Sequence, residues 1–166
     1  MFTSEKPGMM QRVDNMDYII RSATETDLLF CTTLEAYCFS EPWSEKAFSQ
    51  ALLDENTYFF VIEYNGNLAG YYVACNICDE VNLCTIAVDT MQRNSGLASK
   101  LIQHLVNISK QENAFLIGLE VRTSNQSAIH LYEKFNFKQC GKRPNFYRKP
   151  TEDALLYTLQ LNEDTL

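Results

Sequence analysis

The chain has 166 residues, of which 46% are hydrophobic and 21% charged, which predicts one globular domain with a full apolar core. Its net charge of −7 argues against nucleic acid as a partner; the acidity fits a basic partner, and equally fits a chain that is acidic for solubility alone. No apolar run reaches the ~18 residues of a membrane span and no signal-peptide core is present, so a cytoplasmic protein without a membrane partner is expected.

The N-terminus differs in character from the rest of the chain. Residues 1–16 are polar and lack periodicity, so they predict a flexible N-terminal arm, or sequence upstream of a start at Met16. Residues 17–163 are expected to form one domain. Its first strand is predicted at Tyr18–Arg21.

Two helices are expected next. Capping residues at 24–27 precede a segment, 28–38, whose apolar positions keep helical spacing. Ser44 is the expected N-cap of a second helix, whose buried face carries Phe48 and Leu52.

Three strands follow these helices. Residues 58–64 form a strongly apolar, aromatic strand, and residues 65–67, Asn-Gly-Asn, are a hairpin turn signal. The hairpin partner covers residues 68–77 and pairs antiparallel. Residues 81–88 form a further strand.

A long amphipathic helix of about 16 residues is expected after the third of these strands. Its apolar positions Leu97, Leu101, Leu105 and Ile108 repeat at helical spacing. This helix would connect two parallel strands of one sheet.

The C-terminal part alternates strands with one more helix. Residues 114–121 are a continuous apolar run that predicts a central strand, and Asn125 is a suitable N-cap for the helix that follows. Two strands are predicted at 137–140 and 154–161, with a polar loop over 141–153. The order βααβββαβαββ predicts a single-domain α/β fold with a mixed central β-sheet and flanking helices.

The six cysteines give little support for a metal site. Cys75 and Cys78 form a lone CxxC pair, whereas a structural zinc site usually needs two such pairs, and the chain has only two histidines. Free buried thiols and no bound metal are therefore expected.

The turn before the long helix has a single glycine, Gly96, between polar residues. It fits neither a P-loop nor a dinucleotide-binding motif. The amides at the start of the helix would nevertheless attract an anion, since they are unpaired and lie at the positive end of the helix dipole. The same turn would equally serve as a plain helix cap.

The segment 93–98, RNSGLA, fits the pattern Arg/Gln-x-x-Gly-x-Gly/Ala and resembles the acetyl-CoA pyrophosphate loop of the GCN5-related N-acetyltransferase (GNAT) superfamily. The order of elements is similar to that family's from about residue 16 to residue 161. Within it, four stretches look like the bacterial ribosomal-protein-alanine N-acetyltransferases, the RimI group. They are EPWSEK (41–46), IAVD (86–89), LEVRTSNQSAIHLYEKFNF (119–137) and NFY (145–147).

Two residues carry the expected catalysis. Glu120 is the one charge in an apolar strand, so from the residues alone it is either a tolerated edge residue or a functional carboxylate with a raised pKa. Tyr132 lies on the apolar face of its helix, where an ordinary core aromatic is the simpler interpretation. The resemblance implies that Glu120 is the general base and Tyr132 the general acid.

The resemblance also implies that acetyl-CoA is the cosubstrate. The implied cosubstrate-binding residues are Ile86, Ala87, Val88, Asn94, Ser95, Gly96, Leu97, Ala98, Ser99 and Asn125. The implied peptide-binding residues are Pro42, Trp43 and Tyr147, although Trp43 would serve equally as core filler. The loop departs from the family in having Asn94 where a basic residue is usual, so amides and Arg93 would hold the pyrophosphate.

Three functions remain open at this stage. The resemblance favours acetylation of an N-terminal alanine on a small-subunit ribosomal protein, a basic partner, by a monomeric enzyme. The second is acetylation of a small amine such as a polyamine or aminoglycoside, or of other protein N-termini or lysines. The third is an acyl-CoA-binding sensor without activity, against which the presence of both Glu120 and Tyr132 argues.

Overall fold

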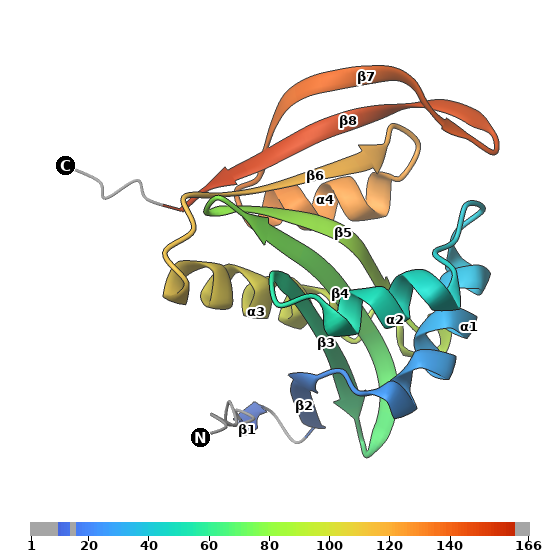
Figure 1. The fold of residues 1–166 in the computed structure, drawn as a ribbon, viewed down its shortest axis with the longest axis vertical. Coiled ribbons are helices and arrows are strands. Elements are labelled where there is room, and N and C mark those ends of the chain that lie inside the picture. Colours follow the sequence, from blue (N-terminus) through green and yellow to red (C-terminus); the bar gives the residue numbers. More distant parts are fainter. Residues whose placement is uncertain (1–9, 14–15, 162–166) are drawn as a thin grey trace.

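An eight-stranded mixed sheet runs through the protein in a computed structural model that describes residues 10–13 and 16–161 (Figure 1). Its strand order is β1-β2-β3-β4-β5-β6-β8-β7. The strands are β1 (Met10–Val13), β2 (Met16–Ser22), β3 (Thr57–Tyr64), β4 (Asn67–Ile77), β5 (Glu80–Val88), β6 (Leu116–Arg122), β7 (Lys138–Arg148) and β8 (Thr151–Gln160). The helices are α1 (Leu28–Cys38), α2 (Glu45–Leu53), α3 (Leu97–Gln111) and α4 (Gln126–Lys134), with short 3-10 turns η1 (Glu25–Asp27) and η2 (Thr90–Gln92).

The predicted α/β class and order of elements are confirmed from β2 onward. The structure adds β1, which pairs antiparallel with β2 inside the segment expected to be a flexible arm. The remainder of that arm, residues 1–9 and 14–15, lies outside the described residues, as do residues 162–163 at the other end of the predicted domain. No helix within 10–13 and 16–161 is long and apolar enough to cross a bilayer.

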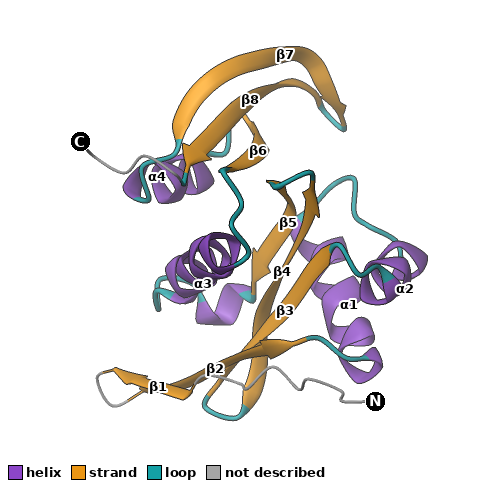
Figure 2. Cartoon of the chain, turned by 60° about the vertical axis from the view of Figure 1, so that its left-hand side comes forward, coloured by secondary structure: helices purple, strands orange, loops and turns teal. Residues whose placement is uncertain are grey.

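Helices cover both faces of the sheet, as Figure 2 shows. Along β3, Phe60 and Ile62 join the core beneath α3 and α4, whereas Phe59 and Val61 join the core beneath α1 and α2. Alternate side chains of a strand point to opposite faces, so both faces of β3 are buried. That explains its unbroken apolar sequence.

The helix ends follow the predicted capping. The Ser44 hydroxyl accepts a hydrogen bond from the amide of Ala47 at 3.1 Å and begins α2. Asn125 caps α4 by accepting from the Ala128 amide at 3.2 Å. All four positions used to predict the long helix, at 97, 101, 105 and 108, are buried in α3.

Strands β5 and β6 part after a short parallel ladder, which is the feature that shapes the site. Among the described residues their pairing ends at Leu83 and Leu119. Beyond that level β5 stays paired with β4 as far as Val88, and β6 stays paired with β8 as far as Arg122. A bulge in the β4–β5 register leaves Cys84 as an extra residue at the point of parting. The two facing edges therefore carry main-chain groups that do not pair with each other.

The prediction of a polar loop over 141–153 is wrong, because most of this segment belongs to the long β7–β8 hairpin. Nearly all side chains of β7 are exposed, so its sequence lacks the alternation that marks a half-buried strand. Its main chain pairs with β8 instead. A register shift between Arg143 and Tyr147 accommodates Pro144, which has no amide hydrogen to donate.

Candidate active site

The turn between β5 and α3 presents main-chain amides at a helix start. The Asp89 side chain accepts a hydrogen bond from the amide of Met91 at 3.0 Å and caps η2. Asn94 and Gly96 then take left-handed conformations, with φ of 62° and 79°, and α3 begins at Leu97. The first amides of α3 have no acceptor within the helix, so they are available to an anion.

Among the described side chains, the cations Arg93 and Lys100 lie next to this turn and contact residues of α1 and β2. The exposed Arg93 places a guanidinium nitrogen 3.7 Å from the Cys38 sulfur at the end of α1. The Lys100 ammonium lies 5.3 Å from the centre of the Tyr18 ring on β2. An anion at the turn would thus be held chiefly by main-chain amides.

Replacing Gly96 with alanine is expected to weaken binding of acetyl-CoA about tenfold, or ~1.4 kcal/mol. A Cβ at Gly96 would meet nothing within 4 Å, so the penalty arises only from the left-handed φ of 79°. An L-residue loses about 1–2 kcal/mol in that conformation, and a relaxed turn would misalign the amides.

Gly66, in the β3–β4 turn, is the matched control because it has φ of 81° and equally open surroundings. Gly66→Ala should lower the unfolding free energy similarly while leaving acetyl-CoA affinity unchanged. Calorimetric titration and thermal unfolding measure the two effects. Equal loss of affinity in both variants would contradict the assignment of the turn.

Glu120 lies on β6 just beyond the level at which β5 parts from it. Its side chain is 27% exposed, while its neighbours Leu119 and Val121 are buried in the core. Because β6 lies between β5 and β8 in the sheet, Glu120 is not on an outer strand. An ion pair joins its Oε1 to an Arg143 guanidinium nitrogen at 3.3 Å.

Two tyrosines belong to the predicted site, Tyr132 on α4 and Tyr147 on β7. Burial and then the charge of Glu120 raise the pKa of Tyr147 to about 12, against the opposing charge of Arg122. Burial, followed by the charge of Tyr147, raises the pKa of Tyr132 well above its usual value. Tyr147 is thus close enough to be influenced by the charge of Glu120, whereas the charge that influences Tyr132 is that of Tyr147. Tyr132 stays protonated, and thus able to donate a proton, throughout the physiological range.

Other residues predicted to bind the cosubstrate lie on β5, in the turn before α3 and at the start of α4. Ala87 and Val88 turn their side chains into the core and Ile86 is half-buried, so their main chain lies along the parted edge of β5. Ser95 is exposed and donates its hydroxyl to the Gln92 carbonyl. Asn125 uses its side-chain oxygen as the cap of α4.

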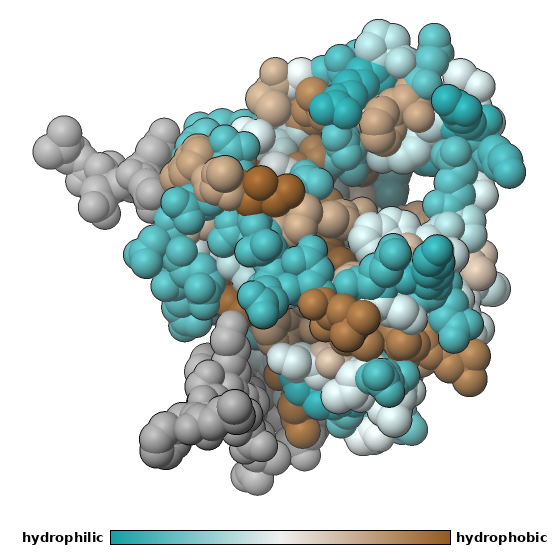
Figure 3. Space-filling view, in the orientation of Figure 1, coloured by the Kyte–Doolittle hydropathy of each residue, from teal (hydrophilic) through white to brown (hydrophobic). Residues whose placement is uncertain are grey.

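The α1–α2 loop supplies the predicted peptide-binding residues. Pro42 is exposed, whereas Trp43 is half-buried with its ring centre 5.5 Å from that of Phe48. The Trp43 amide donates to the buried Glu35 carboxylate at 3.1 Å, so Trp43 has a packing role as well. The molecular surface is hollowed between the side of the protein that carries α1 and α2 and the β7–β8 hairpin (Figure 3).

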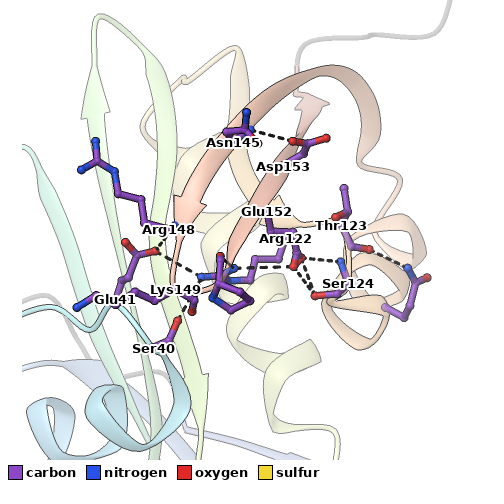
Figure 4. A network of polar contacts seen from close by, with 12 residues as sticks. Ser40, Glu41, Arg122, Thr123, Ser124, Asn145, Arg148, Lys149, Glu152 and Asp153 are labelled. Carbon is purple, nitrogen blue, oxygen red and sulfur yellow. Dashed lines mark hydrogen bonds and ion pairs between the residues drawn. The ribbon is translucent and has the colours of Figure 1, made fainter.

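Arg122, at the end of β6, is the residue that the sequence did not single out. Its guanidinium donates to the Ser40 hydroxyl at 3.2 Å and the Pro150 carbonyl at 3.0 Å, and lies 3.4 Å from the Glu41 carboxylate (Figure 4). It also stacks 4.3 Å from the Tyr147 ring centre. Arg122 thereby links the α1–α2 loop to the β7–β8 hairpin. No sequence pattern reveals contacts with residues 81 and 82 positions away.

The described part of the chain has no cluster of metal ligands. Across residues 10–13 and 16–161, no group of three or more His, Cys, Asp or Glu side chains could hold a metal ion. All six cysteines are free, and Cys78 is exposed in a turn while Cys75 is half-buried in β4.

Known proteins resemble this chain in sequence and in fold. The acetyltransferase (GNAT) family matches residues 24–137. The [ribosomal protein bS18]-alanine N-acetyltransferase of Escherichia coli (strain K12) is 34% identical over 147 residues, covering 86% of this chain and 97% of that protein. The crystal structure of the E. coli ribosomal-protein-S18-alanine N-acetyltransferase superimposes with a TM-score of 0.81 at 32% identity, over 90% of this chain and 98% of that one. Ard1 from Thermoplasma volcanium shares the fold, with a TM-score of 0.81 at 23% identity over 88% and 99% of the two chains.

The fold and the matched segment define a class, the acetyl-CoA-dependent N-acetyltransferases. The chain belongs to the acetyltransferase (GNAT) family.

Proposed function

We propose that the chain transfers an acetyl group from acetyl-CoA to the N-terminal α-amine of a protein, with alanine as first residue and the small-subunit ribosomal protein bS18 as substrate. The observation that carries the proposal is the half-buried Glu120 carboxylate beside the parted strands β5 and β6. The relatives that are one third identical are named for this substrate.

Glu120 is the proposed base. An α-amine has a pKa of about 8, far below the ~10.4 of a lysine amine, so a carboxylate suffices to take its proton, directly or through water. Tyr132 is the proposed acid, which donates a proton to the sulfur of the departing CoA. Its raised pKa keeps that proton in place until the thiolate forms.

Acetyl-CoA supplies the thioester, and the chain offers groups that fit it. The amides at the start of α3 suit the pyrophosphate; the loop residues proposed to contact it are Asn94, Ser95, Gly96, Leu97, Ala98 and Ser99. The free edge of β5 at Ile86–Val88 suits the amide-bearing pantetheine arm. The Asn125 amide group lies at the start of α4 and is a further proposed contact.

The acceptor peptide is proposed to enter between the α1–α2 loop and the β7–β8 hairpin. Pro42 and Trp43 would line one side of this entrance and Tyr147 the other. Arg122 supports the arrangement because it holds both sides at a fixed separation.

A panel of peptides tests the function. The protein is incubated with acetyl-CoA and peptides that begin with Ala, Ser or Met, each containing an internal Lys, and the acetyl group is located by mass spectrometry. Acetylation of the α-amine, fastest on Ala, is the expected result. Acetylation of lysine side chains alone would refute the N-terminal assignment.

A further inference from the structure

The proposed base has a cationic partner from another strand. Among the described residues, Arg143 is the only side chain that forms an ion pair with Glu120, at 3.3 Å. Arg143 is 56% exposed and lies on β7, two strands away from β6. The contact therefore brings a long, exposed arginine side chain from β7 to the carboxylate that would take a proton from the acceptor amine.

The register of the sheet explains how Arg143 reaches Glu120. Glu120 lies opposite Leu156 on β8, whereas Arg143 lies opposite Ala154, two residues away on the same strand. Because residues two apart share a face of a sheet, the ion pair crosses β8 diagonally over the small Ala154 side chain. The Arg143 guanidinium also lies 5.6 Å from the Phe146 ring centre, which holds it at the bulge of β7.

The other carboxylates of the hairpin and the loop are already neutralised by basic side chains. Arg122 interacts with Glu41 at 3.4 Å and with Glu152 at 3.8 Å, and Lys142 pairs with Asp153 at 2.9 Å. A second cation on an acceptor bound at Glu120 would thus be repelled by Arg143. The neighbouring carboxylates, which already form ion pairs, would not compensate for this repulsion.

We propose that Arg143 determines acceptor specificity by charge: it admits an acceptor with a single amine at Glu120 and excludes acceptors that carry a second cation a few ångströms away, such as polyamines. Like charges at short range repel, and a site discriminates by such repulsion as well as by attraction. The guanidinium also favours the neutral form of the bound amine, which is the form that attacks a thioester. This inference rests on the proposed role of Glu120 as base.

Two peptides that differ only at the first residue provide the test. One begins with 2-aminobutyrate and the other with 2,4-diaminobutyrate, which adds one ammonium to a chain of similar size. For the unmodified protein we expect kcat/KM to be much higher for the first peptide. In Arg143→Gln the ratio of the two kcat/KM values should fall by about tenfold or more, and Arg143→Lys should largely restore it.

Lys138→Gln is the matched control, since it removes an exposed positive charge from the same strand without touching Glu120 or the paired carboxylates. The ratio of the two kcat/KM values in Lys138→Gln should equal that of the unmodified protein. An unchanged ratio in Arg143→Gln, or an equal fall in Lys138→Gln, would overturn the proposal. Thermal unfolding of each variant verifies that the ratio is measured on folded protein.

The same experiment separates this inference from the proposed function. If Glu120→Gln acetylates peptides at the full rate, the base assignment fails. If Glu120→Gln is inactive and Arg143→Gln keeps the original ratio, only the role of Arg143 fails.

Discussion

Replacing Glu120 with glutamine is expected to lower kcat about 10²–10⁴-fold at neutral pH. The amide is almost the same size but cannot take a proton from the attacking amine. The first amides of α3, proposed to hold the cosubstrate, are untouched by the change, so affinity for acetyl-CoA should be preserved. Steady-state kinetics with an Ala-terminated peptide and calorimetric titration of acetyl-CoA measure the two quantities.

Glu80→Gln is a suitable control for this variant. Glu80 is an exposed carboxylate on β5, at the end where β5 and β6 still pair. Its replacement should leave kcat within about twofold of the original, as for an ordinary surface change. Full activity in Glu120→Gln would mean that water or another group takes the proton. The residual rate of Glu120→Gln should rise with pH as the α-amine loses its proton, near its pKa of about 8.

Replacing Glu35 with alanine is expected to lower the unfolding free energy by about 3–5 kcal/mol. Glu35 lies on α1 and is 2% exposed. Its carboxylate accepts hydrogen bonds from the Thr85 hydroxyl at 2.9 Å, from the Trp43 amide at 3.1 Å and from the Tyr71 hydroxyl. Removal of the carboxylate deprives the Thr85 and Tyr71 hydroxyls and the Trp43 amide of the acceptor that they share.

Chemical denaturation at neutral pH measures this loss. Glu45→Ala, at an exposed position in the first turn of α2, is the control and should change stability by about 0.5 kcal/mol. The double variant Tyr71→Phe/Thr85→Val removes two of the donors. Combined with Glu35→Ala it should be more stable than Glu35→Ala alone, since fewer buried donors remain unpaired. Equal stability of the two would contradict the interpretation.

Helices and central strands could be predicted because their patterns are local. The bounds of α1 agree with the apolar spacing over 28–38, and Ser44 and Asn125 act as the predicted caps. The same reasoning found only the start of β7, at residues 138–140, and missed the rest, because its side chains are mostly exposed and pairing with β8 defines the strand. Strand β1 likewise depends on its pairing with β2.

The candidate site was only partly predictable. Glu120 stands out as a charge in an apolar run, and the glycine turn marks the start of α3. Nothing local distinguishes Glu35 from a surface glutamate, since its partners come from β4, β5 and the α1–α2 loop. Arg122 and Arg143 act through residues brought near by the folding of the hairpin, so their contacts required the structure.

The parting of β5 and β6 also bears on how the two parts of the sheet hold together. Among the residues that the structure describes, only four residue pairs, from Glu80–Leu116 to Leu83–Leu119, join β1–β5 to β6–β8 by strand pairing. In the proposed complex the pantetheine arm would lie between the two edges and bond to both. The cosubstrate would then complete the sheet as a non-peptide strand, and amide hydrogens on both edges would exchange more slowly while it is bound. Because such contacts involve main chain, they tolerate substitution of the side chains along Ile86–Val88 as long as the strand keeps its course.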